Sequence, residues 1–300
     1  MKSFGRLLTA MVTPFSENGS VDYARARQLA QALVASGTSG IVVAGTTGES
    51  PTLSHEEKLR LFREVKDAVG PERAVIAGTG TNNTAESVSF SREAADLGVD
   101  GILATVPWYN RPPQQGLEAH FRAIADAVDI PVLLYNIPSR TGTNLTPETT
   151  IRLSEVDNIV GVKEASGNLD AIGSIARNAR PGFLVWSGDD AITLPILAIG
   201  GYGVVSVASH LVGRQLARMI DAAVEGSLDE ATHIHSQLSP LFAALSATTN
   251  PIPVKYALSA CGFPCGGLRL PLIEIDDKSR AVMDDALRSV QLDLLTPATA

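Results

Sequence analysis

Residues 158–170 read NIVGVKEASGNLD, an apolar run that ends in a lysine. The β-branched residues Ile159, Val160 and Val162 predict a buried strand of the kind found in parallel sheets. Lys163 follows them directly. A lysine in that place is either a charge that reaches solvent or a buried amine with a chemical role, and the rest of the chain has to distinguish the two.

Short apolar runs of this kind recur along the chain, and segments with helical patterning fill most of the gaps between them. The runs begin near Leu7, Gly40, Ala74, Gly101, Pro131, Asn158, Phe183 and Gly203. Alternating strand and helix units whose strands are apolar along their whole length predict a closed parallel sheet, an α/β fold of the (β/α)8 or TIM barrel type. An open doubly wound sheet is the second interpretation, but it usually has fewer strands.

Capping residues predict where several helices begin and end. Asp22 is expected to cap one helix. Ser54 and Glu57 have the spacing of a capping box, and Gly70 follows the same helical segment as its C-terminal signal. Thr84 is expected to open the next helix.

The alternation ends after the eighth strand. Helix-like segments alone follow, which predicts a barrel catalytic domain over residues 1–225 and a C-terminal helical extension over residues 226–300. Residues 295–300, LTPATA, are expected to form a frayed tail.

Composition argues against several classes of protein. The 300 residues carry a formal net charge of -8, and Lys and Arg do not gather with aromatic residues, which disfavours nucleic-acid or anionic-membrane binding. Residues 191–209 are uncharged but contain Pro195 and three glycines, so they predict a buried helix followed by a buried strand, not a membrane span. The first apolar stretch is too short for a secretory leader, and a cytoplasmic protein is expected.

The cysteines and histidines do not predict a metal site. Cys261 and Cys265 are too few for a disulfide scaffold and are expected to be reduced thiols. One residue separates His233 from His235, which is not the usual helical metal-ligand spacing, so no metal is expected.

Unusual polar residues stand where the predicted strands end. Since active sites of such barrels lie at the carboxyl ends of the strands, these side chains should converge on one opening. They are Thr46 and Thr47 after the second strand, Tyr109 after the fourth, Tyr135 and Arg140 at the fifth, Lys163 at the sixth and the SGDD segment at the seventh. Each has an ordinary alternative, such as a tight turn, a packed tyrosine or a solvated arginine.

Together, however, these residue types suit one chemistry. A neutral lysine amine at position 163 can attack a ketone, and the resulting iminium acidifies the neighbouring carbon. Tyr135, on the adjacent strand, suits the proton transfers, with Thr46 and Tyr109 as a relay. The GTTGES turn can bind a keto-acid carboxylate through N–H groups and hydroxyls, and Arg140 can receive a second acidic substrate.

Six motifs carry a family resemblance that runs from about Gly5 to the last helix. GTTGES, WYNRP, YNIPSRTG, VKEASGNL, SGDD and NPIPVK resemble the dihydrodipicolinate synthase branch of the N-acetylneuraminate lyase superfamily. The resemblance implies a barrel with a C-terminal helical extension, assembled as a homotetramer of two tight dimers. It also implies condensation of pyruvate with L-aspartate-4-semialdehyde on the route to lysine and diaminopimelate, with no cofactor and no catalytic metal.

The matched motifs also imply roles for single residues. Lys163 would form the Schiff base with pyruvate and Tyr135 would act as acid and base. Thr46 and Tyr109 would complete the relay, the tyrosine coming from the other subunit of the tight dimer. Further matched residues are Thr47 for the pyruvate carboxylate, Arg140 for the carboxylate of the aldehyde, and Gly188 and the backbone of Val205 as pocket lining. By strand alternation Glu164 should point away from Lys163 and have a structural role.

Another set of residues matches the allosteric cleft of the family: Ser50, Pro51, His55, Lys58, Asn82, Glu86 and Trp108. Several lysine-sensitive members resemble this chain there but have alanine, histidine and tyrosine in place of Pro51, Lys58 and Trp108. The added charge at Lys58 should disfavour a cationic effector, so weak or absent inhibition by lysine is predicted.

Three alternatives remain open at this point. Arg140 favours a synthase over a sialic acid lyase or keto-deoxy-sugar acid aldolase of the same superfamily, whose members generally lack it. A pyridoxal-phosphate barrel would also use a lysine imine, with residues 200–203, GGYG, holding the phosphate. A barrel without catalysis, serving as a binding subunit, is disfavoured by the intact set of Lys163, Tyr135, Thr46 and Arg140.

Overall fold

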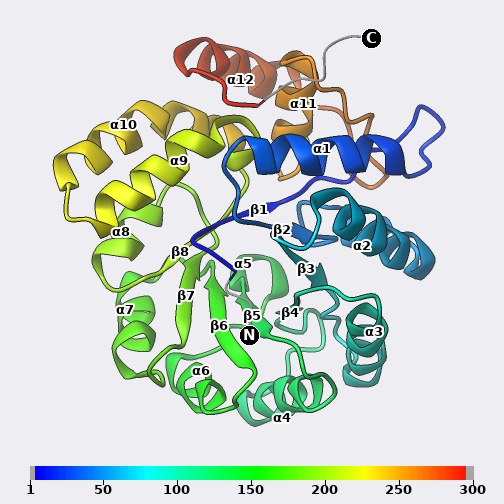
Figure 1. The fold of residues 1–300 in the computed structure, drawn as a ribbon, viewed down its shortest axis with the longest axis vertical. Helices are drawn as coiled ribbons and strands as arrows, with labels where there is room; N and C mark the ends of the chain where they lie inside the picture. The colour runs from blue at the N-terminus through cyan, green and yellow to red at the C-terminus, as the bar shows by residue number, and fades with distance from the viewer. Residues whose placement is uncertain (1–3, 295–300) are drawn as a thin grey trace.

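Eight parallel strands pair in chain order in the computed structural model, which describes residues 4–294, and β1 also pairs with β8, so the sheet closes (Figure 1). The predicted barrel is confirmed. The strands are β1 (Leu7–Ala10), β2 (Gly40–Val43), β3 (Ala74–Gly78), β4 (Gly101–Thr105), β5 (Val132–Asn136), β6 (Ile159–Glu164), β7 (Leu184–Ser187) and β8 (Gly203–Ser206).

Helices surround the strands and continue past the barrel. They are α1 (Tyr23–Ala35), the short 3₁₀ helix η1 (Ser50–Thr52), α2 (His55–Val69), α3 (Thr84–Asp96), α4 (Gln114–Ala125), α5 (Pro138–Thr141), α6 (Pro147–Ser154), α7 (Leu169–Asn178), α8 (Thr193–Ala198), α9 (Ser209–Val224), α10 (Leu228–Leu245), α11 (Ile252–Ala260) and α12 (Asp277–Ser289). The predicted domain boundary at residues 225–226 falls between α9 and α10.

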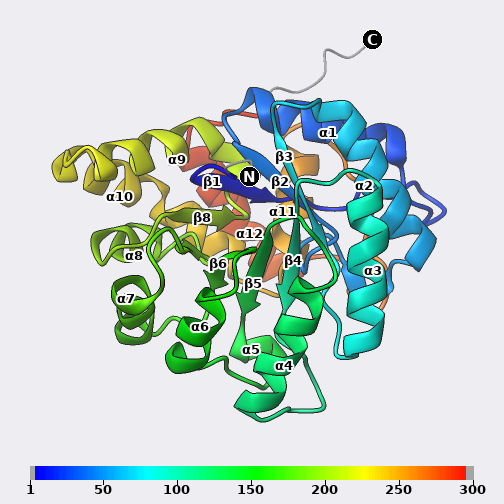
Figure 2. The same ribbon diagram turned by 60° about the horizontal axis from the view of Figure 1, so that its bottom comes forward.

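The C-terminal helices pack against one side of the barrel. In Figure 1, α10 lies along α9, and α11 and α12 lie beyond α1. Figure 2 shows α11 and α12 behind the strands of the barrel. The chain therefore returns from the eighth unit to the region of the first two, which brings residues of the extension to the barrel.

Successive strand residues point alternately outward to the helices and inward to the barrel interior, so they belong to two apolar clusters. One cluster lies between strands and helices, and the other, which includes Leu8, Ile76, Leu133 and Val205, contains strand residues without helix residues and fills the barrel interior. Lys163 is in register with Tyr135 and Trp186, which belong to the interior cluster, so it points inward. Glu164 therefore points outward, as alternation predicts.

Most of the predicted caps are present. The Asp22 side chain accepts a hydrogen bond from the backbone N–H of Arg25 at 2.8 Å. The capping box of Ser54 and Glu57 is formed, with distances of 3.2 and 2.9 Å, and Gly70 ends α2 with a φ of 72°. These local signals set where α1 begins and where α2 begins and ends.

The prediction for Thr84 is wrong by one residue. Asn83 is the N-cap of α3, and its side-chain oxygen accepts from the N–H groups of Ala85 and Glu86. Thr84 is the first helical residue, and its hydroxyl pairs instead with the His120 ring at 2.9 Å. Asparagine is the stronger N-cap because its carbonyl reaches these two donors at once.

The uncharged segment at residues 191–209 forms α8 and β8, as predicted. Within residues 4–294, none of the helices has the length and apolar character needed to span a membrane. The expected frayed tail, residues 295–300, lies outside the described residues.

Candidate active site

A cavity of about 330 Å³ lies at the carboxyl ends of the strands. Six of the predicted site residues line it: Thr46, Thr47, Tyr135, Arg140, Lys163 and Gly188. Side chains from the β2, β5, β6 and β7 ends therefore converge, as the barrel hypothesis requires. The loop between α10 and α11 closes another part of the wall through residues 248–250.

Lys163 is buried without a counter-ion. Its exposed fraction is 6%, and among residues 4–294 no carboxylate lies within ion-pair distance of its Nζ atom. The amine faces the ring of Tyr135, with 4.1 Å between Nζ and the ring centroid. A Cβ atom at Gly188 would lie 3.2 Å from the lysine Cε, so a larger residue there would crowd the lysine side chain.

Tyr135 lies beside Lys163 on the adjacent strand, and the two residues are register partners. Its side chain is 3% exposed. Within the described part of the chain its hydroxyl makes no hydrogen bond, which leaves both its proton and its oxygen free to face a bound molecule. The tyrosine is therefore placed to exchange a proton with a group attached to the lysine.

The turn after β2 holds an uncommon backbone conformation. Ala44 and Glu49 have φ values of 52° and 55°, in the left-handed region that non-glycine residues rarely adopt. Gly48 packs so closely that a Cβ would lie 3.1 Å from the Cα of Ala44. This tight turn holds Thr46 and the buried Thr47 against the cavity.

Asn250, which sequence reasoning did not single out, joins two substrate-binding candidates. Its Nδ2 donates to the hydroxyl of Thr47 at 2.9 Å, and its backbone oxygen accepts from Arg140 at 3.3 Å. Because Thr47 accepts this bond, its own hydroxyl proton remains available for a carboxylate. The NPIPVK motif contained Asn250, but only the folded chain brings it next to Thr47, 203 residues away.

Asp190 also lines the cavity. The sequence analysis named its SGDD motif but gave Asp190 no role of its own. Its Oδ2 accepts from the backbone N–H groups of Val207 and Ala208 at 3.0 and 2.9 Å. Burial raises the pKa of its carboxyl above the ordinary value, and these hydrogen bonds partly oppose the shift. Asp190 thus ties the end of β7 to the segment after β8.

Two predicted site residues do not line this cavity. Tyr109 is 89% exposed, with a φ of 73°, and the single chain does not bring it to Lys163. Val205 is buried in the barrel interior, and Val207 lines the cavity instead. Within one chain, Thr46 and Tyr135 are therefore the only members of the predicted relay at the described cavity.

Glu164 lies on the outer face of β6. It is buried, accepts from the side-chain amide of Asn136 at 3.1 Å, and accepts from the backbone N–H of Ser166 at 2.8 Å. Burial raises the pKa of its carboxyl, and these hydrogen bonds oppose the shift. Its contacts link β5 to the loop after β6, a structural role.

A second cavity, of about 540 Å³, adjoins the first and shares Thr46, Ile137 and Arg140 with it. The residues matched to the allosteric cleft that line it are Ser50, Pro51, Lys58, Asn82, Glu86 and Trp108. His55 is not among them, since it pairs with Glu93 at 2.8 Å on the surface. Burial lowers the pKa of Lys58, and the nearby Glu86 opposes that shift.

Residues 4–294 contain no group of three or more His, Cys, Asp or Glu side chains arranged to hold a metal ion. Cys261 and Cys265 are free thiols, and burial raises the pKa of Cys265 to about 12. His235 packs against the Phe242 ring, with 5.7 Å between the ring centroids and the planes tilted by 52°.

Comparison with known proteins gives a consistent assignment. The model of the dihydrodipicolinate synthetase family matches residues 3–290. The 4-hydroxy-tetrahydrodipicolinate synthase of Dehalococcoides mccartyi is 55% identical over 98% of this chain and 99% of that protein. The Symbiobacterium thermophilum enzyme of the same name is 57% identical over 97% and 98%.

Solved structures agree in fold. The Cyanidioschyzon merolae enzyme, crystallised with lysine bound, superposes with a TM-score of 0.94 at 51% identity, covering 95% of this chain and 98% of that one. The Bacillus anthracis dihydrodipicolinate synthase superposes with a TM-score of 0.94 at 42% identity, covering 97% and 100%. The chain described here, a lysine-bearing parallel barrel with a C-terminal helical extension, belongs to the dihydrodipicolinate synthetase family.

Proposed function

We propose that this chain is a 4-hydroxy-tetrahydrodipicolinate synthase, a lyase that joins pyruvate to L-aspartate-4-semialdehyde through a Schiff base on Lys163. The observation that carries the proposal is the buried, unpaired amine at the end of β6, which opens into a cavity beside Tyr135 and Arg140. Relatives with that name, at 55% and 57% identity over almost the whole chain, support it.

In this scheme the amine of Lys163 attacks the ketone carbon of pyruvate, and water leaves to give an iminium. Tyr135 supplies and removes the protons, since its ring lies 4.1 Å from the lysine Nζ and its hydroxyl faces the same cavity. The positive iminium then lets the methyl carbon lose a proton and form an enamine. The enamine carbon attacks the aldehyde of the second substrate, which makes the new carbon–carbon bond and regenerates the iminium. The amino group of that substrate then attacks the iminium carbon, which closes the ring and breaks the bond to Lys163.

Thr47 and the turn around it suit the pyruvate carboxylate. The hydroxyl proton of Thr47 is available because its oxygen already accepts from Asn250. Arg140 suits the carboxylate of the aldehyde, and the Asn250 backbone oxygen holds its guanidinium. Thr47, Arg140 and Lys163 line the same cavity, so both carboxylates would be held in it beside the amine.

The exposed position of Tyr109 fits a role across a subunit interface. We assign it to the relay of a neighbouring chain in a homotetramer made of two tight dimers. We assign catalysis to residues 1–225, with Asn250 of the extension, residues 226–300, completing the wall of the cavity. As an enzyme that consumes pyruvate for biosynthesis, the protein is proposed to act in the cytoplasm without a cofactor.

Borohydride reduction in the presence of pyruvate, followed by mass spectrometry of peptides, tests the lysine. An adduct on Lys163 is expected, and an adduct elsewhere or none would contradict the proposal. Comparing L-aspartate-4-semialdehyde with sugar-derived aldehydes as the second substrate tests the reaction. A clear preference for a sugar-derived aldehyde would assign the chain to a different aldolase activity. Strong visible absorbance of the purified protein would instead indicate pyridoxal phosphate.

A further inference from the structure

A buried ion pair lies next to the cavity without lining it. Lys255 of α11 and Glu49 of the turn after β2 are 3% and 2% exposed, and 2.7 Å separates Lys255 Nζ from Glu49 Oε1. Neither residue is part of the cavity wall. The mechanism proposed above does not use this pair, although it joins the extension to the turn that carries Thr47.

The surroundings of Lys255 fix its position closely. Its Nζ also donates to the backbone oxygen of Gly267 at 2.6 Å and lies 4.2 Å from the centroid of the Phe15 ring. The ammonium is therefore held by a carboxylate, a carbonyl and an aromatic face. Such a set of contacts allows one arrangement of the lysine and hence one position for the Glu49 carboxylate.

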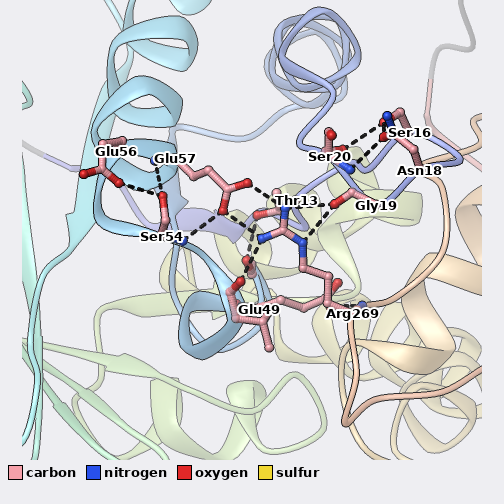
Figure 3. Close-up of polar contacts among 12 residues, drawn as sticks. Thr13, Ser16, Asn18, Gly19, Ser20, Glu49, Ser54, Glu56, Glu57 and Arg269 are labelled. Carbon is pink, nitrogen blue, oxygen red and sulfur yellow. Dashed lines mark hydrogen bonds and ion pairs between the residues drawn. The ribbon is translucent and has the colours of Figure 1, made fainter.

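The second oxygen of Glu49 is held as well. It accepts from the backbone N–H of Arg269 at 3.1 Å. The Arg269 guanidinium in turn donates to both oxygens of Glu57 at 2.7 and 2.6 Å and to the backbone oxygen of Gly19 at 2.8 Å (Figure 3). The Glu49 carboxylate is thus fixed from two directions by the same C-terminal segment.

The α10–α11 loop and α11 each make a hydrogen bond to the turn after β2. Asn250, just before α11, donates to Thr47, and Lys255, about one turn into the helix, pairs with Glu49. Glu49 has a left-handed backbone, which an L-residue adopts only when its contacts hold it there. A loss of the Lys255 contact would therefore let the backbone of Glu49 relax and carry Thr47 with it.

We propose that the Glu49–Lys255 ion pair is a positioning device for the keto-acid subsite, through which the C-terminal extension sets the Thr46–Thr47 turn in its binding geometry. The inference rests on the proposed function, because it assigns the pyruvate carboxylate to that turn. An apolar contact in place of the Glu49–Lys255 ion pair would also exclude water from this region. It would not hold the side chain of residue 49 in one direction, as the ion pair does.

The test compares three variants of the full-length protein in steady-state kinetics. Lys255→Met and Glu49→Gln each remove the ion pair, while Glu57→Gln removes the neighbouring pair with Arg269 and leaves the turn's own contacts intact. The first two should raise KM for pyruvate by about tenfold or more, with a smaller change in kcat. KM for the aldehyde should change by less than about threefold in every variant.

Glu57→Gln is the control that distinguishes an effect on the position of the Thr46–Thr47 turn from a general loss of protein stability. It should lower the melting temperature while leaving KM for pyruvate within about twofold of the wild type. If Lys255→Met does not yield folded protein, Glu49→Gln carries the test, because it keeps the shape of the side chain and an acceptor for Arg269. An unchanged KM for pyruvate in Glu49→Gln, or an equal rise in Glu57→Gln, would overturn the inference.

Borohydride trapping distinguishes this failure from failure of the proposed function. Wild-type protein that forms the pyruvate adduct on Lys163, together with variants of unchanged KM, would overturn the positioning role alone. Absence of the adduct in the wild type would overturn the proposed function and the inference with it.

Discussion

Lys163 and Lys255 are buried to a similar degree, and their neighbours differ. Lys255 meets the Glu49 carboxylate at 2.7 Å and a backbone carbonyl at 2.6 Å. Lys163 meets the face of Tyr135 and an open cavity, and no carboxylate among residues 4–294 pairs with it. Burial alone therefore does not identify a reactive lysine. The two lysines differ in whether a carboxylate of the protein pairs with the amine or the amine faces an open cavity.

The difference also concerns stability. Burial lowers the pKa of Lys255, and the Glu49 carboxylate, which pairs with it, opposes that shift. An unpaired buried amine contributes no such contact, and proteins keep one where function requires it. The contrast gives four predictions, from the largest expected effect to the smallest.

Replacing Lys163 should have the largest effect on activity. Lys163→Met removes the proposed nucleophile, and kcat for condensation should fall by roughly 10³-fold or more, since no other amine occupies its place. Lys255→Met should still form the borohydride-trapped adduct with pyruvate, although at lower affinity. Adduct formation in Lys163→Met at a normal rate would contradict the assignment of the two lysines.

For stability the order of the two variants should be reversed: Lys255→Met should have the larger effect. Lys255→Met leaves the Glu49 carboxylate buried and unpaired, which should lower the free energy of unfolding by about 3–5 kcal/mol. Lys163→Met removes an unpaired amine and should leave stability unchanged or raise it by about 1 kcal/mol. Urea unfolding of both variants measures this, and equal losses in the two would remove the distinction.

A buried histidine extends the comparison to pH. His210 accepts from the backbone N–H of Val12 through Nε2 and donates to Val207 O through Nδ1, so the fold needs the neutral ring. Burial lowers its pKa from 6.5 to about 4. Because the pKa of His210 is lower in the folded chain than in the unfolded chain, the neutral ring stabilises the fold fully above pH 6.5. This stabilisation is lost as the pH falls from 6.5 towards 4.

That loss should approach about 3 kcal/mol from His210 alone near the lower end of the range. Urea unfolding at several pH values between 7 and 4 measures it, with His210→Gln as the comparison because the amide does not titrate. The variant should show a shallower fall in stability across this range. An identical slope would assign the acid sensitivity to other groups.

Lys58, a half-buried lysine, should give the smallest effect. It lies in the second cavity with Glu86, and its charge should repel a cationic effector. We expect half-inhibition by L-lysine only at roughly millimolar concentration or above. Lys58→His should strengthen inhibition, since it reduces that charge at pH 8. A low-micromolar inhibition constant in the wild type would contradict the prediction.

The sequence by itself determined the barrel and the strand that carries Lys163. Apolar runs such as residues 159–162 predict buried strands because parallel strands are covered on both faces, and alternation separates Lys163 from Glu164. Asp22 and Ser54 could be assigned as caps because capping depends on residues within one turn of each other. Such features need only local geometry or regular spacing.

Only the tertiary structure decided how distant segments meet. Asn250 and Lys255 reach the turn after β2 because α11 packs beside the barrel, and no periodicity in the chain relates positions 203 and 206 residues apart. Tyr109 illustrates the same limit, since its exposed position depends on a loop conformation with positive φ. The pairing that distinguishes Lys255 from Lys163 is a long-range contact, and long-range contacts are set by packing of the whole fold.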